Sequence, residues 1–283
     1  MSNPAWIDGV HCDLSEAKVS IEDRGYLLGD GVYEVIRIYN GQPFYLAAHL
    51  ERMERSAAAI RIEIPYAKNE LETAISELIA KSSYADGYIY MQLTRGSAKR
   101  DHLFPGDAKP TLVMYVRELP PLPDLENVNP AACITVPDER WLNCYIKTIN
   151  LLPNLLARQK AHESGAIEAL FYRPGGWLTE GTRSNLFAVL DGIVYTHPAT
   201  NLILPGITRE IVIGLIQKLG IPFKEEAFYL DHIGKASEVW ITSTTLEVQP
   251  INLIDHSELG YPCPGETCLQ LMKEFRSLVA EAR

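Results

Sequence analysis

The chain has 283 residues, of which 47% are hydrophobic and 22% are charged, as in an ordinary soluble globular protein. Acidic residues outnumber basic ones by 36 to 26, and the formal net charge is -10. This balance argues against a nucleic-acid-binding protein, which needs a basic face for phosphates. No run reaches the roughly 18 apolar residues that span a membrane, and the N-terminus lacks a signal-peptide pattern. We therefore expect a cytoplasmic protein without membrane or nucleic-acid partners.

The five cysteines predict reduced thiols and no metal site. They are widely scattered, and their number is odd, which is unusual for a disulfide framework. Cys263 and Cys268 have the wrong spacing for a zinc site and lack a matching second pair.

Local patterns predict a mixture of strands and helices. Hairpin turns are expected at Asp8-Gly9, Asn40-Gly41, Gly175-Gly176 and Asp191-Gly192, because these residues tolerate positive φ. The alternation in YIYMQLTR predicts a strand with Ile89, Met91 and Leu93 on one face. Two apolar stripes predict helices, one formed by Leu50, Met53, Ala57 and Ile60, the other by Leu71, Ile75, Leu78 and Ile79.

Further helices are predicted at about 153–164, 207–219 and 265–281. The stretch from Arg117 to Pro130 holds four prolines and indicates a linker. We expect an α+β protein with a smaller N-terminal domain at residues 1–119, a linker at 120–130 and a larger C-terminal domain at 131–283.

Lys147 is the first candidate for chemistry. It follows an apolar, strand-like run and precedes a helix that opens near Pro153. A lysine at a strand end often extends its stem along the core and reaches water, and this is the ordinary interpretation. The alternative is a half-buried amine with a lowered pKa, as a Schiff-base lysine requires.

Two segments have the features of anion sites. Pro205-Gly206 precedes a predicted helix whose first residues include Ile207 and Thr208, where free N–H groups favour an anion. Ser243, Thr244 and Thr245 place three hydroxyl groups at a strand end. Taken alone, Thr208 is equally an N-cap and the three hydroxyls a satisfied turn.

Two charged residues complete the candidates. Glu180 precedes Gly181, where an acid is usually a turn residue, yet a carboxylate facing a ring nitrogen would keep that nitrogen protonated. Arg52 stands in a run of charges that by default forms a solvated helix face. An aldehyde for the lysine, a phosphate for the anion sites and a ring nitrogen for the glutamate are all features of pyridoxal 5'-phosphate.

The order of six motifs resembles that of the fold-type IV, or branched-chain-like, PLP-dependent aminotransferases, most of all their D-amino acid aminotransferase branch. The motifs are EDRGYLLGDGVYEVIRIYNG, HLERMERSA, IKTINLL, TEGTRSNLF, LPGITRE and TSTTLE, and they cover nearly the whole chain. The resemblance implies the fold-type IV architecture, with the cofactor between the two domains. It also implies that Lys147 forms the Schiff base and moves the proton and that Glu180 binds the pyridine nitrogen. Arg52, Ile207, Thr208 and Thr244 would bind the phosphate.

The resemblance also interprets the basic segment TRGSAKRDHLFP. Arg100 and His102 match the Arg-x-His pair that, with a tyrosine matched by Tyr33, binds the substrate carboxylate. In this branch the pair comes from a neighbouring subunit, which implies a homodimer with a shared active site. Without the resemblance, the cluster is a solvated loop. Arg183 departs from the branch, whose corresponding turn is small and serine-rich, and it puts the substrate range in doubt.

The resemblance implies a ping-pong transamination from a D-amino acid to a 2-oxo acid such as 2-oxoglutarate or pyruvate. The alternatives on the same fold are a branched-chain L-amino acid transaminase, an R-amine transaminase and an aminodeoxychorismate lyase. A phosphate-ligand-binding protein without catalysis is a further alternative, and the presence of Lys147 opposes it.

Overall fold

The computed structural model describes residues 3–120 and 122–282 of the chain. They divide into two compact units. Unit 1 is the described part of Met1–Pro121 together with Ile146–Asn150 and Ala282, and unit 2 comprises Leu122–Tyr145 and Leu151–Glu281. This division differs from the contiguous domains expected at 1–119 and 131–283, because Ile146–Asn150 belongs to unit 1.

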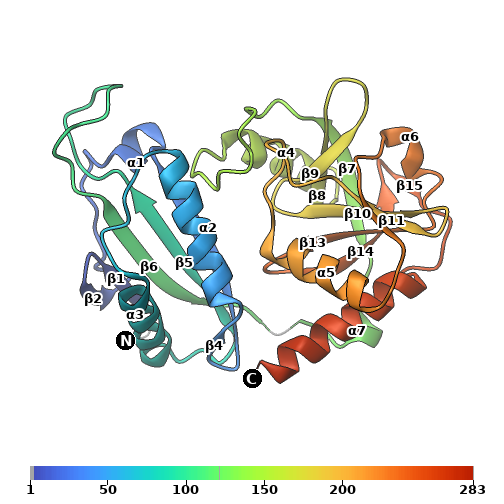
Figure 1. Cartoon of the computed structure of the whole chain (residues 1–283), viewed down its shortest axis with the longest axis horizontal. Coiled ribbons are helices and arrows are strands. Elements are labelled where there is room, and N and C mark those ends of the chain that lie inside the picture. The colour runs from blue at the N-terminus through green and yellow to red at the C-terminus, as the bar shows by residue number, and fades with distance from the viewer. Residues whose placement is uncertain (1–2, 121, 283) are drawn as a thin grey trace. The chain divides into compact units, whose positions relative to one another are not determined.

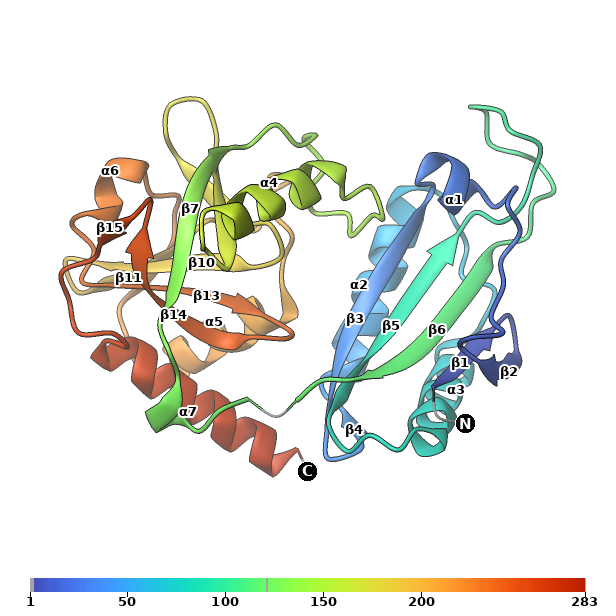
Figure 2. The same cartoon turned by 180° about the vertical axis from the view of Figure 1, so that it is seen from behind.

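Unit 1 is built on a six-stranded antiparallel sheet with the order β2-β1-β6-β5-β3-β4. Figures 1 and 2 show the helices α2 and α3 on one face of this sheet. The elements are β1 (Pro4–Ile7), β2 (Val10–Asp13), α1 (Arg24–Leu28), β3 (Gly31–Tyr39), β4 (Gln42–Pro43), α2 (Leu46–Ala59), α3 (Lys68–Lys81), β5 (Gly87–Thr94) and β6 (Thr111–Glu118).

The predicted stripes form the core of unit 1. Leu50, Met53 and Ala57 from α2 are buried, Ile60 packs against the same core, and all four apolar residues of the α3 stripe are buried. They meet the buried face of β5, whose Ile89, Met91 and Leu93 are fully buried. The opposite face carries stacked tyrosines, with ring centres 5.8 Å apart for Tyr33 and Tyr90 and 5.1 Å for Tyr90 and Tyr115.

Unit 2 contains a mixed sheet with the path β12-β11-β10-β13-β14-β7-β8-β9, on which β15 pairs with β14. The helix α4 lies against β7 and β8, whereas α5 and α7 pack together beside β13 (Figure 1). The elements are η1 (Leu125–Asn127), β7 (Ala131–Pro137), α4 (Leu152–Glu163), β8 (Glu168–Tyr172), β9 (Leu178–Gly181), β10 (Asn185–Leu190), β11 (Ile193–Thr196), α5 (Ile207–Lys218), β12 (Phe223–Glu225), α6 (Leu230–Ile233), β13 (Glu238–Ser243), β14 (Glu247–Ile254), β15 (Ser257–Glu258) and α7 (Glu266–Glu281).

The four predicted hairpin turns are confirmed. Each connects two antiparallel strands, and both central residues of each have positive φ, as in Asn40 (49°) and Gly41 (76°). The three later helices also lie within a residue of their predicted bounds. The predicted linker begins just beyond the end of β6 at Glu118, and its Pro121 lies outside the described residues. Within residues 3–120 and 122–282, no helix is long and apolar enough to cross a membrane.

Candidate active site

Lys147 is held at the edge of the sheet of unit 1. The amide of Tyr33 donates to the Lys147 carbonyl (3.0 Å), and the amide of Ile149 donates to the Gly31 carbonyl (3.1 Å). The Lys147 amide in turn lies 3.2 Å from the Ser56 hydroxyl on α2. A segment of otherwise irregular backbone is thus fixed along β3, and the position of Lys147 is set by main-chain bonds rather than by its side chain.

The side chain of Lys147 is half-buried against an aromatic surface. Its Nζ atom lies 4.3 Å from the ring centre of Tyr33, within range of a cation–π interaction. Tyr33 stacks on Tyr90, so the amine is placed beside rigid, low-entropy side chains. The structure therefore brings together two residues predicted for different roles, Lys147 and Tyr33.

Arg52 lies in a buried ionic triad, so the default expectation of a fully solvated charged face is wrong for this residue. Its Nε and Nη2 atoms donate to the two carboxylate oxygens of Glu34, both at 2.8 Å. His49 Nδ1 lies 2.8 Å from Glu34 Oε2. All three residues are at most 3% exposed, whereas Glu51, Glu54 and Arg55 of the same helix face solvent.

Burial would raise the pKa of Glu34, but Arg52 and His49 outweigh it, and this pKa lies well below its ordinary value. Burial also lowers the pKa of His49 despite the neighbouring carboxylate. The triad thus combines an ionised Glu34 with a neutral His49 at neutral pH. Sequence reasoning missed Glu34 and His49; the signal was an acid within a largely apolar strand.

Glu180 is the centre of a second buried network, in unit 2. Its Oε1 atom accepts from Arg140 Nη1 at 2.7 Å, and Oε2 accepts from Asn185 Nδ2 at 3.1 Å and from the Leu204 amide at 3.0 Å. Arg140 is itself held by both carboxylate oxygens of Asp138, each at 2.9 Å. Glu180 is therefore not an ordinary solvent-exposed turn residue, since hydrogen bonds fix both oxygens of its carboxylate.

Burial raises the pKa of Glu180 to about 7, with the charge of Arg140 and the hydrogen bonds acting in the opposite direction. The group therefore titrates near neutral pH. Such a carboxylate is suited to share a proton with a ring nitrogen, because the two protonation states are close in free energy.

The same network reaches the N-terminus of α5. The Asn185 amide donates to the Leu204 carbonyl (2.9 Å), just before the N-cap residue Gly206. A Cβ atom at Gly206 would lie 2.2 Å from Asn185 Oδ1, so only glycine permits this approach. Gly206 has no side chain with which to cap the helix, and Ile207 and Thr208 therefore begin α5 with amides available to an anion.

Thr244 and Arg183 lie in turns near this network. Asn185 pairs with Thr242 of β13, and Thr244 follows in the turn beyond Ser243. The turn after Glu180 is organised by the fully buried Glu168, which accepts from the hydroxyl of Ser184 (2.9 Å) and from the amide of Thr182 (3.1 Å). The Arg183 side chain is exposed.

Arg100 and His102 are exposed in the loop between β5 and β6. No hydrogen bond joins either side chain to Tyr33 within the described part of the chain. The three residues predicted for the carboxylate site therefore belong to one unit, but the structure leaves their joint role a prediction.

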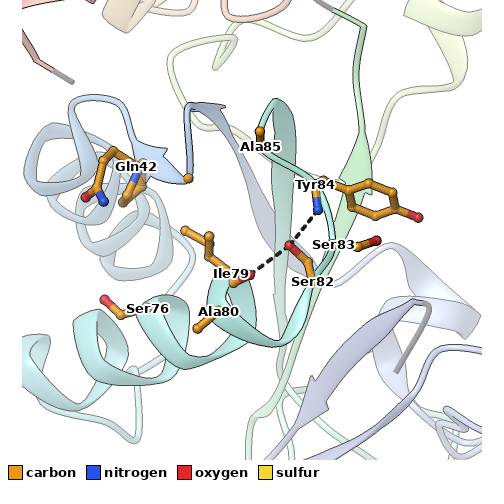
Figure 3. A pocket seen from close by; sticks show the side chains of 10 residues that line it. Gln42, Ser76, Ile79, Ala80, Ser82, Ser83, Tyr84 and Ala85 are labelled. Carbon is orange, nitrogen blue, oxygen red and sulfur yellow. Dashed lines mark hydrogen bonds between the residues drawn. The ribbon is translucent and has the colours of Figure 1, made fainter.

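A surface hollow of about 420 Å³ lies elsewhere in unit 1, between the C-terminal part of α3 and β4. Figure 3 shows Gln42, Ser76, Ile79 and Tyr84 among its lining side chains. Neither a charged group nor a predicted site residue lines it. This hollow is not the site that the sequence predicts.

Comparison with known proteins identifies the family. The model of the amino-transferase class IV family matches residues 31–254. The chain belongs to this family. It is 43% identical to a D-alanine aminotransferase of Staphylococcus haemolyticus over 97% of each chain, and 45% identical to one of Bacillus licheniformis over 89% of each.

Solved structures of branched-chain aminotransferases share the fold. The enzyme of the archaeon Thermoproteus uzoniensis, solved with norvaline, has a TM-score of 0.89 and 28% identity, over 99% of this chain and 95% of that one. A second branched-chain amino acid aminotransferase, solved with pyridoxamine 5'-phosphate, has a TM-score of 0.92 and 30% identity, over 100% of this chain and 96% of that one.

These findings confirm the predicted family, the fold-type IV class and the aminotransferase activity, and with them the dependence of a class IV aminotransferase on pyridoxal 5'-phosphate. The residues fit this cofactor. Lys147 offers a half-buried amine, Glu180 a fixed carboxylate, and the uncapped start of α5 at Gly206 free backbone amides of the kind that favour an anion.

Proposed function

We propose that the chain is a D-amino acid transaminase, which moves an amino group from a D-amino acid to a 2-oxo acid such as pyruvate or 2-oxoglutarate. The observation that carries this proposal is the likeness, at 43–45% identity over most of the chain, to the two D-alanine aminotransferases. The Arg100-x-His102 pair in the loop after β5 supports it, because it supplies donors for a planar carboxylate. A cytoplasmic location remains a prediction.

Pyridoxal 5'-phosphate, when bound, supplies an aldehyde and a ring that takes up electrons. Lys147 would hold the cofactor through its aldehyde group, and the amine of Lys147 would carry the Cα proton of the substrate. Glu180, fixed by Arg140, would keep the ring nitrogen protonated. The amides of Ile207 and Thr208, the hydroxyl of Thr244 and the guanidinium of Arg52 are proposed to bind phosphate.

Arg100, His102 and Tyr33 are proposed to bind the substrate carboxylate. A bidentate arginine fixes the plane of the carboxylate, and this plane determines which substituent of Cα faces the lysine amine. The handedness of the substrate follows from that choice. Arg183 has two alternative roles: its exposed side chain faces solvent, or it meets the side-chain carboxylate of an acidic substrate.

We further propose that two copies form the active dimer, with Arg100 and His102 acting in the site of the partner. Three large apolar side chains of unit 1 support this inference, since they are unusually exposed. They are Ile21 (79%), Tyr26 (75%) and Leu103 (78%), and Leu103 directly follows His102. Burial of such side chains against a second copy would remove apolar surface from water. Light scattering tests the dimer directly.

The experiment that tests the function is a half-reaction on the loaded enzyme without an acceptor. D-alanine, D-glutamate, L-leucine and L-glutamate are added separately, and the change in the visible absorption of the cofactor is followed. Conversion by the D-isomers alone supports the proposal. Conversion by L-leucine and L-glutamate would instead assign the chain to the branched-chain enzymes, two of which are the solved structural relatives described above.

A further inference from the structure

The loop that carries Arg100 and His102 is closed at its base. Gly96, which follows β5, has a φ of 89°, and a Cβ atom there would lie 1.8 Å from the Lys109 carbonyl oxygen. The two ends of the loop, before residue 97 and after residue 108, are therefore in backbone contact. Between these ends the loop is largely exposed, so little apolar packing orders its middle.

A largely buried ionic cluster lies beside the base of the loop. Asp30 accepts from Arg24 Nε at 2.8 Å, and from Arg95 Nε and Nη2 at 2.8 and 3.0 Å. Arg24 is 2% exposed and Arg95 7%. Burial opposes the ionisation of Asp30, but the two arginines outweigh it and lower its pKa. One carboxylate thus fixes two guanidinium groups at neutral pH.

The two arginines hold different backbone segments. Arg95 donates to the carbonyls of Ile60 (2.7 Å) and Arg61 (2.9 Å), which ties β5 to the end of α2. Arg24 donates through Nη1 to the Asp101 carbonyl at 2.7 Å. Asp101 is the residue between Arg100 and His102. Arg24 therefore holds the peptide that separates the two proposed carboxylate-binding residues.

Arg95 also touches the loop, but further along it and without a hydrogen bond to its backbone. The carbon of its guanidinium lies 3.6 Å from the ring centre of Phe104, a cation–π contact on a ring that is half exposed. The hydrogen bond from Arg24 is thus the one that acts on the backbone next to Arg100 and His102.

The backbone around Arg24 makes the same connection. The Arg24 amide donates to the Gly96 carbonyl (2.9 Å), and the Ala98 amide donates to the Glu22 carbonyl (3.3 Å). Asp23 also accepts from the Thr94 hydroxyl at 2.8 Å. The residue that donates to Asp101 therefore lies on a segment that is also hydrogen-bonded to the first residues of the loop.

We propose that Arg24, fixed by Asp30, is a positioning residue for the carboxylate site, because it holds the Arg100–His102 peptide in place before substrate arrives. This inference rests on the proposed function of Arg100 and His102. The charge-assisted hydrogen bond orders the loop when the protein folds, so the entropic cost of this ordering does not reduce the free energy of substrate binding. Without the bond, the loop must be ordered when the substrate binds, and this weakens binding. KM therefore rises more than kcat falls.

The test compares Arg24→Lys and Arg24→Gln with the wild-type loaded enzyme. The lysine retains a charge for Asp30 but cannot bond to Asp30 and to the Asp101 carbonyl at the same time, whereas the glutamine loses both the charge and this bridge. We expect KM for D-alanine to rise about 10-fold in each, the equivalent of one charge-assisted hydrogen bond, with kcat little changed. The control is Lys99→Gln, which removes a charge from the same loop and leaves the anchor intact.

A second readout monitors the loop itself. Trypsin cleaves after Lys99 and Arg100, and mass spectrometry of the native enzyme measures the rate. The proposal expects faster cleavage at these bonds in both Arg24 variants, with an unchanged rate elsewhere. Equal cleavage rates in variants and wild type would refute it. A joint fall of kcat and thermal stability with KM unchanged would also refute it, because that pattern indicates a purely structural residue.

The two proposals fail separately. A wild-type enzyme that leaves D-alanine and D-glutamate unconverted refutes the proposed function, and with it the link between Arg24 and the substrate carboxylate. Active wild-type enzyme with an unaltered KM in both Arg24 variants refutes the positioning role alone.

Discussion

The Glu180 carboxylate lies 2.7 Å from Nη1 of Arg140, an arginine that is itself clasped by Asp138. Burial raises the pKa of Glu180 to about 7, and the fixed positive charge of Arg140 acts against that rise. This balance makes the protonation of Glu180 sensitive to a single neighbour.

Replacing Arg140 should shift the pH dependence of the reaction. In Arg140→Met, burial acts on Glu180 without the opposing charge, so the pKa of Glu180 rises above about 7. Below that pKa, each unit by which the pH falls lowers the ionised fraction of Glu180 about ten-fold. We expect the acid limb of kcat/KM to move to higher pH, and activity at alkaline pH to recover. Arg37→Met, which removes a buried arginine from the other unit, should reduce stability without moving the limb.

Replacing Lys147 should separate catalysis from folding. Lys147→Ala removes the proposed proton carrier, and we expect turnover to fall by at least about 100-fold. The fold should persist because the segment is held by backbone bonds to Tyr33 and Gly31. The control is Lys224→Ala, since Lys224 also lies over a tyrosine ring, that of Tyr195 at 5.6 Å. A similar loss of turnover in both variants would contradict a specific role for Lys147.

A methyl group at Gly206 should weaken cofactor binding. In Gly206→Ala the added Cβ would collide with Asn185 Oδ1 at 2.2 Å, which displaces the start of α5 from the Glu180 network. We expect a higher Kd for pyridoxal 5'-phosphate, measured by titration of the apoenzyme. Gly214→Ala in the same helix meets nothing within 4 Å and should instead stabilise the fold by up to about 1 kcal/mol. Equal affinities in the two variants would count against phosphate binding at the start of α5.

The Glu34 triad should make stability depend on acid pH. Because the folded pKa of Glu34 is depressed, its contribution is complete above the ordinary value of 4.5 and is lost as pH falls below it. At pH 7, Glu34→Gln should destabilise the protein by about 3 kcal/mol or more, since a buried charge loses its partner. Urea unfolding should show this difference shrinking below pH 4.5. Glu51→Gln, on the exposed side of α2, should show neither effect.

The sequence predicts regular elements well where the pattern is local. The α3 stripe identified a buried helix face, and Asn40-Gly41 identified a hairpin, because each depends on residues close in the chain. Glu34 and His49 could not be recognised in the same way. A single acid in a strand is indistinguishable from a surface residue until the packing of α2 on β3 brings Arg52 to it.

The clamp on Glu180 escaped prediction for a similar reason. Arg140 and Asp138 lie in an irregular stretch after β7, and nothing local marks them as partners of an acid on β9. The anchor formed by Arg24 and Asp30 also joins residues far apart in the sequence, because β3, β4 and β5 lie between Arg24 and the loop that it contacts. Long-range polar contacts of this kind depend on topology rather than on periodicity.

Because Ile146–Asn150 follows the linker in sequence but belongs to unit 1, a fragment that ends at the linker would lack part of unit 1. A product ending at the linker would keep Tyr33, Arg100 and His102 but would leave the edge of β3 bare and lack the lysine. A fragment that starts at the linker would carry Lys147 on a segment that lacks its hydrogen-bonding partners on β3. Mixing the two should therefore restore turnover only if this five-residue segment of the C-terminal fragment docks along β3 of the N-terminal fragment, which makes complementation a direct measure of that docking.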